Sequence, residues 1–198
     1  MARPGPQGGQ YQPLTGEQIQ RIHQASLAVL ERTGVHVENE QALDLYREGG
    51  ARVDGNRVFI PPSVIQDALE KAPSKVLLAG RDPAQDLVLE GRRVYAGTGG
   101  SPTMVLDPGA DAVRPGTLQD LADLARLAGA LEHCDFIAIP LFPTDIAAED
   151  APVNRFYACL RNSTKHVMSN VQGEAGSLLG VGQVLELGAM IAGGAEAL

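Results

Sequence analysis

From Thr117 onward the sequence alternates helical patterns with short apolar runs, and this alternation limits the possible folds more than any other feature. The pattern "LQDLADLARLAGAL" has helical spacing, and the run "CDFIAIP" that follows is almost entirely apolar. Such a run is typical of a strand buried on both faces. A second helix, "APVNRFYACLRN", and a second strand, "HVMSNV", come next, before a final apolar helix from Ser177. Helices and strands that alternate in this way predict a parallel sheet in an α/β domain.

Before this point, local signals predict a small α+β region over residues 14–115. Capping, turn and breaker residues mark three helices and one hairpin in its first half. The residues that begin or end these elements are Thr15, Gln18, Gly34, Asn39, Gly49, Asp54, Gly55, Pro61 and Pro73. From Lys75 the spacing of apolar residues becomes typical of strands, in the runs "KVLLA", "DLVLE", "RRVYAG" and "TMVLD". Turn residues separate these four runs, which therefore predict a small antiparallel meander.

The two ends of the chain give simpler predictions. Residues 1–13 are rich in Pro, Gly and Gln, and we expect a disordered tail there. In residues 116–198 only two strong parallel strands are visible, which are too few for a stable α/β sheet or a closed barrel. We therefore expect this region to be the opening of an α/β layer in an unfinished chain.

Composition excludes several classes of function. The net charge of −8 makes a nucleic-acid backbone an improbable partner. Cys134 and Cys159 lack C-x-x-C spacing and are expected to be buried free thiols in a reducing cytosol. No secretory signal or membrane span is visible, so we expect a cytoplasmic protein that does not contact membranes. The four histidines, which fit no metal-binding spacing, are His23, His36, His133 and His166. The sequence therefore predicts no metal site.

The stretch "YAGTGGSPTMVLDPG" permits three interpretations. A phosphate-binding loop needs G-x-G-x-x-G followed by a helix, but Pro102 takes the third glycine position and a strand pattern follows. The second interpretation is a glycine-rich connection between two strands, Arg92–Ala96 and Thr103–Asp107. In the third, the missing side chains let a ligand or a partner approach the backbone closely. The last two remain open.

Taken in order, several segments resemble one known family. They are the run from "LTGEQIQRIHQ" at Leu14 to "QDALEKAP", followed by "GTGGSPTMVLD", "RPGTLQDLADLARLAGAL", "DFIAIP" and "TKHVMSNV". This ordered combination is similar to the N-terminal part of the trimethylamine methyltransferase family. The family includes pyrrolysine-containing enzymes for trimethylamine and relatives without pyrrolysine that act on betaines.

The resemblance implies a TIM (β/α)8 barrel of which this chain holds the N-terminal part, preceded by the α+β region. It also implies methyl transfer from a tertiary or quaternary amine to a cobalt corrinoid carried by a separate partner protein, with no cofactor bound directly. Residues 1–198 alone are not expected to be active, because most barrel strands are missing. A non-catalytic α/β binding or assembly module derived from the family is the alternative.

In a barrel of this kind, ligand-binding residues lie at the carboxyl ends of the strands. After the first predicted strand, Phe142 is a candidate for one wall of a cation cage and Asp145 for a partner of the ammonium group. After the second, Asn170 and Gln172 are candidates for binding a betaine carboxylate. A packed aromatic ring, a turn residue and loop hydrogen bonding are the respective structural alternatives.

A second group of candidates comes from the glycine-rich stretch. Thr98, Gly99, Gly100 and Ser101 are expected to form a loop near the barrel mouth, where a ligand or the corrinoid of the partner approaches. The last strand and helix read as elements buried on two sides, with nothing later in the chain to cover them. Exposed apolar surface of this kind favours association, so we expect a homo-oligomer.

Overall fold

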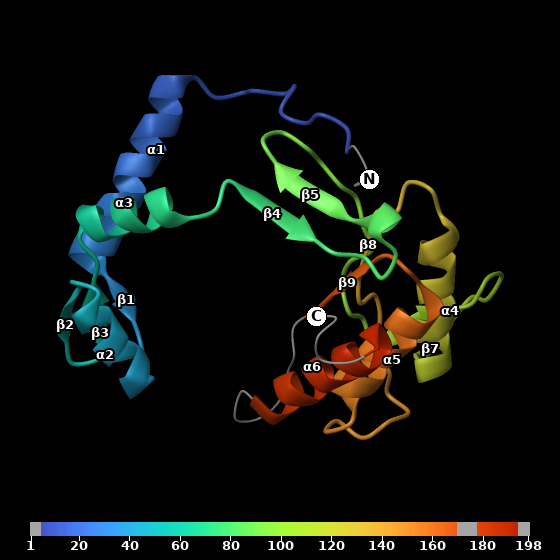
Figure 1. Cartoon of the computed structure of the whole chain (residues 1–198). Coiled ribbons are helices and arrows are strands. Elements are labelled where there is room, and N and C mark those ends of the chain that lie inside the picture. Colours follow the sequence, from blue (N-terminus) through green and yellow to red (C-terminus); the bar gives the residue numbers. More distant parts are fainter. Residues whose placement is uncertain (1–4, 170–177, 194–198) are drawn as a thin grey trace. The chain divides into compact units, whose positions relative to one another are not determined.

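The computed structural model describes residues 5–169 and 178–193, which fall into two compact units (Figure 1). The smaller unit comprises residues 9–74, and the larger comprises residues 1–8 together with 75–198. The sequence had indicated a change of organisation near residue 115, whereas the contacts within the chain divide it between Ser74 and Lys75.

The smaller unit begins with α1 (Gly16–Ala28), which the predicted capping box starts. The Thr15 hydroxyl accepts a hydrogen bond from the Gln18 amide, and the Gln18 side chain accepts one from the Thr15 amide. A π-helical turn, η1 (Val29–Thr33), continues the helix to Gly34. Gly34 has a φ of +68°, and a Cβ there would lie 2.4 Å from the Val58 carbonyl oxygen. Glycine is therefore required at this helix end, as predicted.

Three short strands and two more helices complete the smaller unit. Its antiparallel sheet has the order β1 (Val35–His36), β3 (Arg57–Phe59) and β2 (Arg52–Asp54). The Asp54–Arg57 pair closes the hairpin predicted at Asp54-Gly55. The helices α2 (Glu40–Glu48) and α3 (Pro62–Lys71) also begin at the predicted cap and proline. A small apolar core joins these elements, and its buried members are Leu43, Ala51, Val58 and Ile60.

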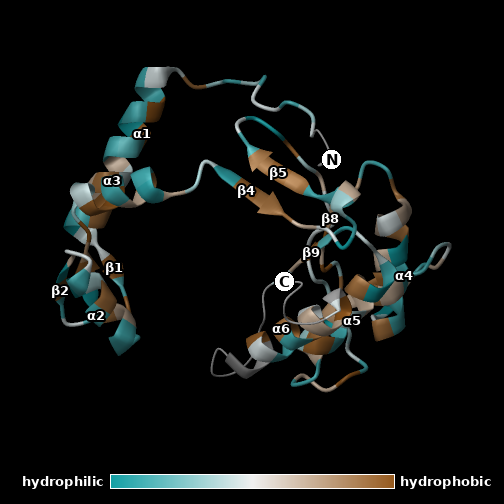
Figure 2. Ribbon diagram, in the orientation of Figure 1, coloured by the Kyte–Doolittle hydropathy of each residue, from teal (hydrophilic) through white to brown (hydrophobic). Residues whose placement is uncertain are grey.

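The predicted antiparallel meander in the larger unit forms only in part, because its first two strands pair in antiparallel orientation but the pairing does not continue to the next two runs. The structure forms two separate hairpins: β4 (Lys75–Leu78) with β5 (Leu87–Glu90), and β6 (Met104–Leu106) with β7 (Val113–Pro115). A short 3-10 helix, η2 (Pro83–Gln85), lies between β4 and β5. In Figure 2 the β4–β5 hairpin is largely hydrophobic, and Leu87 on β5 is completely buried.

The run Arg92–Ala96, predicted as a strand of that meander, has other neighbours. Residue Arg93 bridges Gln7 in antiparallel orientation, and hydrogen bonds join Pro6 and Gly8 to the same segment. Part of the stretch predicted to be a disordered tail is therefore paired in the structure. The meander fails because the partner of this segment comes from the chain's beginning, which a count of local strand patterns cannot reveal.

The helix–strand alternation after Thr117 forms as predicted. The elements are α4 (Leu118–Ala130), β8 (Phe136–Ala138), α5 (Ala151–Asn162), β9 (His166–Met168) and α6 (Leu178–Ala192). Strands β8 and β9 pair in parallel, with Phe136 opposite His166. The parallel pairing confirms the α/β character of this region, while a complete barrel stays a prediction.

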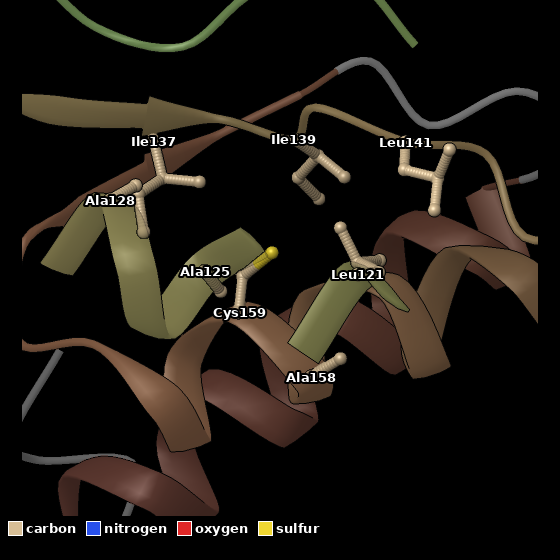
Figure 3. Packing of buried hydrophobic residues seen from close by; sticks show 8 residues of the cluster. All are labelled: Leu121, Ala125, Ala128, Ile137, Ile139, Leu141, Ala158 and Cys159. Atoms are coloured by element: carbon tan, nitrogen blue, oxygen red, sulfur yellow. The ribbon is translucent and has the colours of Figure 1, made fainter. Parts of the chain in front are cut away.

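The core of the larger unit lies between α4, the β8 segment and α5 (Figure 3). Leu121, Ala125 and Ala128 of α4 pack against apolar residues of the β8 segment, and Cys159 of α5 lies among them. These buried side chains hold β8 in place, so that the residues that follow it have fixed positions. None of the helices in the described part of the chain is long and apolar enough to cross a bilayer.

Candidate functional site

The glycine-rich stretch runs alongside β8 and does not connect two antiparallel strands. Gly97 bridges Phe136 in parallel orientation, and the Asp135 amide donates to the Ala96 carbonyl at 2.6 Å. A Cβ at Gly97 would lie 2.6 Å from the Phe136 ring, so only glycine permits this close approach. Three extended parallel segments therefore lie side by side, around residue 97, in β8 and in β9. Their carboxyl ends meet at one edge, which we call the strand-end site.

The predicted loop residues Thr98 and Ser101 turn their hydroxyls towards the end of β8. Thr98 Oγ1 donates to the Ala138 carbonyl at 2.7 Å, and Ser101 Oγ donates to the Ile139 carbonyl at 3.0 Å. Between them, Gly99 and Gly100 are exposed, and a Cβ at Gly99 would meet nothing within 4 Å. The loop therefore presents bare backbone to its surroundings while its hydroxyls fix it to β8.

Phe142 lies at the same edge, whereas Asp145 lies at the start of α4. The Phe142 amide donates to the Pro102 carbonyl at 2.9 Å, which places the two loops next to each other. Asp145 is exposed, and its Oδ1 accepts a hydrogen bond from the Leu118 amide at 2.9 Å. A carboxylate at a helix N-terminus is stabilised by the free amides and by the helix dipole.

Among the described residues, no hydrogen bond or ion pair joins Asp145 to Phe142, Thr98 or Ser101. The other two candidates, Asn170 and Gln172, lie outside the described residues. The structure thus brings together one aromatic ring and the glycine-rich loop, and it places the candidate carboxylate at a neighbouring helix end.

Sequence analysis missed the residue that links these parts, Arg155 of α5. Its side chain is buried, and its Nη2 donates to Ser101 Oγ at 3.1 Å and to Ser169 Oγ at 3.3 Å. Its guanidinium carbon lies 4.8 Å from the centre of the Phe142 ring. This distance is typical of a cation–π contact. A signal was available, because Arg155 shares helical spacing with the buried Ala151 and Cys159.

Burial controls the electrostatics of the site. It lowers the pKa of the Arg155 guanidinium, while the nearby Cys159 thiol opposes that shift. Burial also raises the pKa of the Cys159 thiol to about 12, with Arg155 opposing that shift. The thiol is therefore neutral at physiological pH and is a poor nucleophile.

Lys165 and His166 stabilise the opposite end of the β9 segment. The buried Lys165 ammonium donates to the Ala128 carbonyl at 2.8 Å and to the Leu131 carbonyl at 2.6 Å, at the end of α4. His166 Nδ1 lies 2.8 Å from the Ala79 carbonyl oxygen.

Across residues 5–169 and 178–193, no group of three His, Cys, Asp or Glu side chains is placed to hold a metal ion. The groups that the described residues bring to the strand-end site are the Arg155 guanidinium, the Phe142 ring and the backbone of Gly99 and Gly100.

Comparison with known proteins identifies the family of this chain. The model of the trimethylamine methyltransferase family matches residues 4–196. A trimethylamine methyltransferase of Desulfitobacterium hafniense is 36% identical over 187 residues, which cover 93% of this chain and 37% of the relative. A glycine betaine methyltransferase of the same species is 31% identical, over 83% of this chain and 34% of the relative.

A trimethylamine methyltransferase of Methanosarcina thermophila is 32% identical, over 77% of this chain and 33% of the relative. The matched region is thus about a third of each relative's length. The matches nevertheless cover nearly all of this chain. The chain therefore belongs to the trimethylamine methyltransferase family.

Proposed function

We propose that this chain forms part of a methyltransferase that moves a methyl group from a tertiary or quaternary amine to the cobalt of a corrinoid protein. The observation that carries the proposal is the family match over residues 4–196. The names of two relatives, a trimethylamine and a glycine betaine methyltransferase, support trimethylamine or a betaine as the methyl donor.

The residues of the strand-end site suit a reaction that depends on positioning. Transfer of a methyl group to cobalt is a displacement on carbon, and the corrinoid of the partner supplies the nucleophile. The site has to hold the donor in line and exclude water, and it does not have to supply a protein nucleophile. Burial keeps the Cys159 thiol neutral, so this thiol does not act as such a nucleophile. The bare backbone at Gly99 and Gly100 is where we place the approach of the partner.

Asp145 is proposed to contribute negative charge towards the ammonium group. Its Oδ1 is held by the Leu118 amide, so a change to Asn can keep an acceptor there while it removes the charge. We expect Asp145→Asn to weaken binding of trimethylamine-type cations more than binding of a neutral isostere. Asp111→Asn, on the exposed β6–β7 connection, is the matched control and should change neither. Equal weakening of the cation and of the isostere would exclude this role.

The proposed activity is tested with a cobalt(I) corrinoid protein and a panel of donors. Trimethylamine and several betaines are mixed with the reduced corrinoid protein, and methyl-cobalt formation is followed by absorbance. We expect transfer from a protein of the relatives' length that contains this chain, and none from residues 1–198 alone. No transfer from any tertiary or quaternary amine by the longer protein would refute the proposal and favour a non-catalytic binding module.

A further inference from the structure

The side chain of Arg155 is a buried cation, and its hydrogen-bond partners among the described residues are neutral. It is 3% exposed, and its Nη2 bonds two serine hydroxyls, those of Ser101 and Ser169. Its Nε is buried, and no hydrogen-bond partner for it lies in the described part of the chain. Within residues 5–169 and 178–193, no carboxylate forms an ion pair with it.

A buried guanidinium with neutral partners is stabilised when an anion binds to it. Burial of a charge without a counter-charge is strongly unfavourable, and two hydroxyls compensate only part of that cost. Arginine stays protonated even when burial lowers its pKa, so it cannot escape the cost by losing a proton. Nearly all buried polar groups in proteins are hydrogen-bonded, so an unpartnered Nε indicates a missing acceptor.

The position of Arg155 identifies the chemistry of that acceptor. Its guanidinium already faces the Phe142 ring, so a substrate ammonium on the same ring face would meet a like charge. A carboxylate matches the planar fork of donors and can accept from Nε and from a terminal nitrogen together. Trimethylamine has no such group, whereas a betaine has one a short distance from its trimethylammonium centre.

We propose that Arg155 binds the carboxylate of the methyl donor, so that the preferred substrate is a zwitterionic quaternary amine. The substrate part of this inference rests on the proposed function. Ser101, itself bonded to the Ile139 carbonyl, and Ser169 hold the guanidinium plane at the ends of the strands. The ammonium end then points away from Arg155, because the two positive charges repel each other. Arg155 is thus a specificity-determining residue.

The test observes Arg155 directly, by NMR of the arginine Nε–Hε groups in the 15N-labelled chain. The signal of Arg155 is identified by its loss in Arg155→Lys. The probes are acetate, glycine betaine and choline, which carries the same trimethylammonium group with a hydroxyl in place of the carboxylate. We expect acetate and glycine betaine to shift the Arg155 signal, and glycine betaine to bind about tenfold or more tightly than choline.

Two variants separate a role in recognition from a role in folding. Arg155→Lys keeps the charge but loses the fork, so glycine betaine should bind about tenfold more weakly while choline binding is unchanged. Arg161→Lys, an exposed arginine on the same helix, is the matched control and should alter neither. The circular dichroism spectrum and melting temperature establish that both variants fold.

Three results would each overturn the inference. The first is that the Arg155 signal responds to no carboxylate, and the second is that Arg155→Lys weakens the binding of glycine betaine and of choline equally. The third is that the Arg155 signal changes only with protein concentration. The last would assign the missing anion to a second copy of the chain. Failure of the proposed function is seen separately, as absence of methyl-cobalt formation while the Arg155 signal still responds to glycine betaine.

Discussion

The two units of the chain are built from different kinds of contact. In the smaller unit, residues 9–74, the strand pairs join residues no more than 23 positions apart, as Val35 and Val58 are, and caps and turns mark nearly every boundary. In the larger unit, the decisive contacts join residues that are far apart in sequence. Arg155 and Ser101 are separated by 54 positions, and Lys165 and Ala128 by 37. Local signals therefore specify the first unit, whereas the second depends on long-range pairing.

The units also differ in what they bury. The buried polar or charged residues among the described positions are Arg155, Ser163 and Lys165, all in the larger unit. The core of the smaller unit consists of a few apolar side chains. Because a buried polar group is costly when its partner is lost, single changes should damage the larger unit more than the smaller one. Hydrogen exchange followed by mass spectrometry measures the opening free energy of each unit separately.

The largest effect is expected from Lys165→Met. The change leaves the carbonyls of Ala128 and Leu131 at the end of α4 without the ammonium that they share. Loss of two charged hydrogen bonds in a buried place should cost about 3 kcal/mol of unfolding free energy. Exchange should accelerate in α4 and β9, while peptides of residues 9–74 keep their protection.

Lys71→Met provides the control for that variant. Lys71 is an exposed residue in the last turn of α3, so its loss should change the stability of either unit by less than about 0.5 kcal/mol. If both variants behaved alike, the buried ammonium would not be a principal support of the larger unit.

Gly97→Ala should have the next largest effect. The new Cβ would lie 2.6 Å from the Phe136 ring, so the extended segment has to move away from β8. Overpacking of this kind costs about 1–3 kcal/mol, which thermal unfolding and the exchange of β8 peptides would register. At Gly99 an added Cβ meets nothing within 4 Å, so Gly99→Ala should be nearly neutral. A neutral Gly97→Ala would mean that this segment does not pack against β8 in solution.

The same contrast explains what sequence could and could not predict. The capping residues Thr15 and Asn39, the turn at Gly55 and the alternation after Thr117 all act through near neighbours, and each prediction was confirmed. The meander failed because the partner of Arg93 is Gln7, more than 80 positions earlier. Periodicity reports which face of an element is apolar, and it does not report which element will cover that face.

The candidate site shows the same limit. In the structure Phe142 and the loop of Thr98 and Ser101 lie next to each other at the end of β8, while their role in binding a ligand stays a prediction. Arg155 was overlooked because it lies in the middle of a helix, where charged residues usually face solvent. Its spacing from Cys159 placed it on the buried face, and a charge on such a face is the signal to look for.

Asn39→Ala tests the smaller unit at a local signal. The Asn39 side chain accepts a hydrogen bond from the Ala42 amide and so caps α2. Its removal should cost about 1 kcal/mol, and the loss should be confined to exchange in residues 9–74. Asn39→Asp keeps an acceptor at the cap and should stay within a few tenths of a kcal/mol of the original chain. Faster exchange in α4 or α5 would show that the two units do not open independently.

The smallest effect should appear on acidification, at Arg114 in the larger unit. Arg114 Nε lies 2.7 Å from Asp107 Oδ2, and its Nη1 lies 2.7 Å from Asp120 Oδ2. The hydrogen bonds from Arg114 lower the pKa of both carboxyl groups, and those from Thr117 lower the pKa of Asp120 further. A carboxyl group whose pKa is lower in the folded chain than in the unfolded chain stabilises the fold above the unfolded value, about pH 4.

That stabilisation is therefore lost as the pH falls below about 4, because the unfolded chain then takes up protons that the folded chain resists. The pairs are partly exposed, so solvent screens them and the loss should be smaller than that of the Asn39 cap. Urea unfolding followed between pH 5 and pH 3 should show a weaker pH dependence for Asp107→Asn than for the original chain. Asp44→Asn removes a carboxylate from the exposed pair with Arg47 in the smaller unit and should leave the curve of the larger unit unchanged. An unchanged slope in Asp107→Asn would mean that acid acts on the larger unit through groups other than those that Arg114 holds.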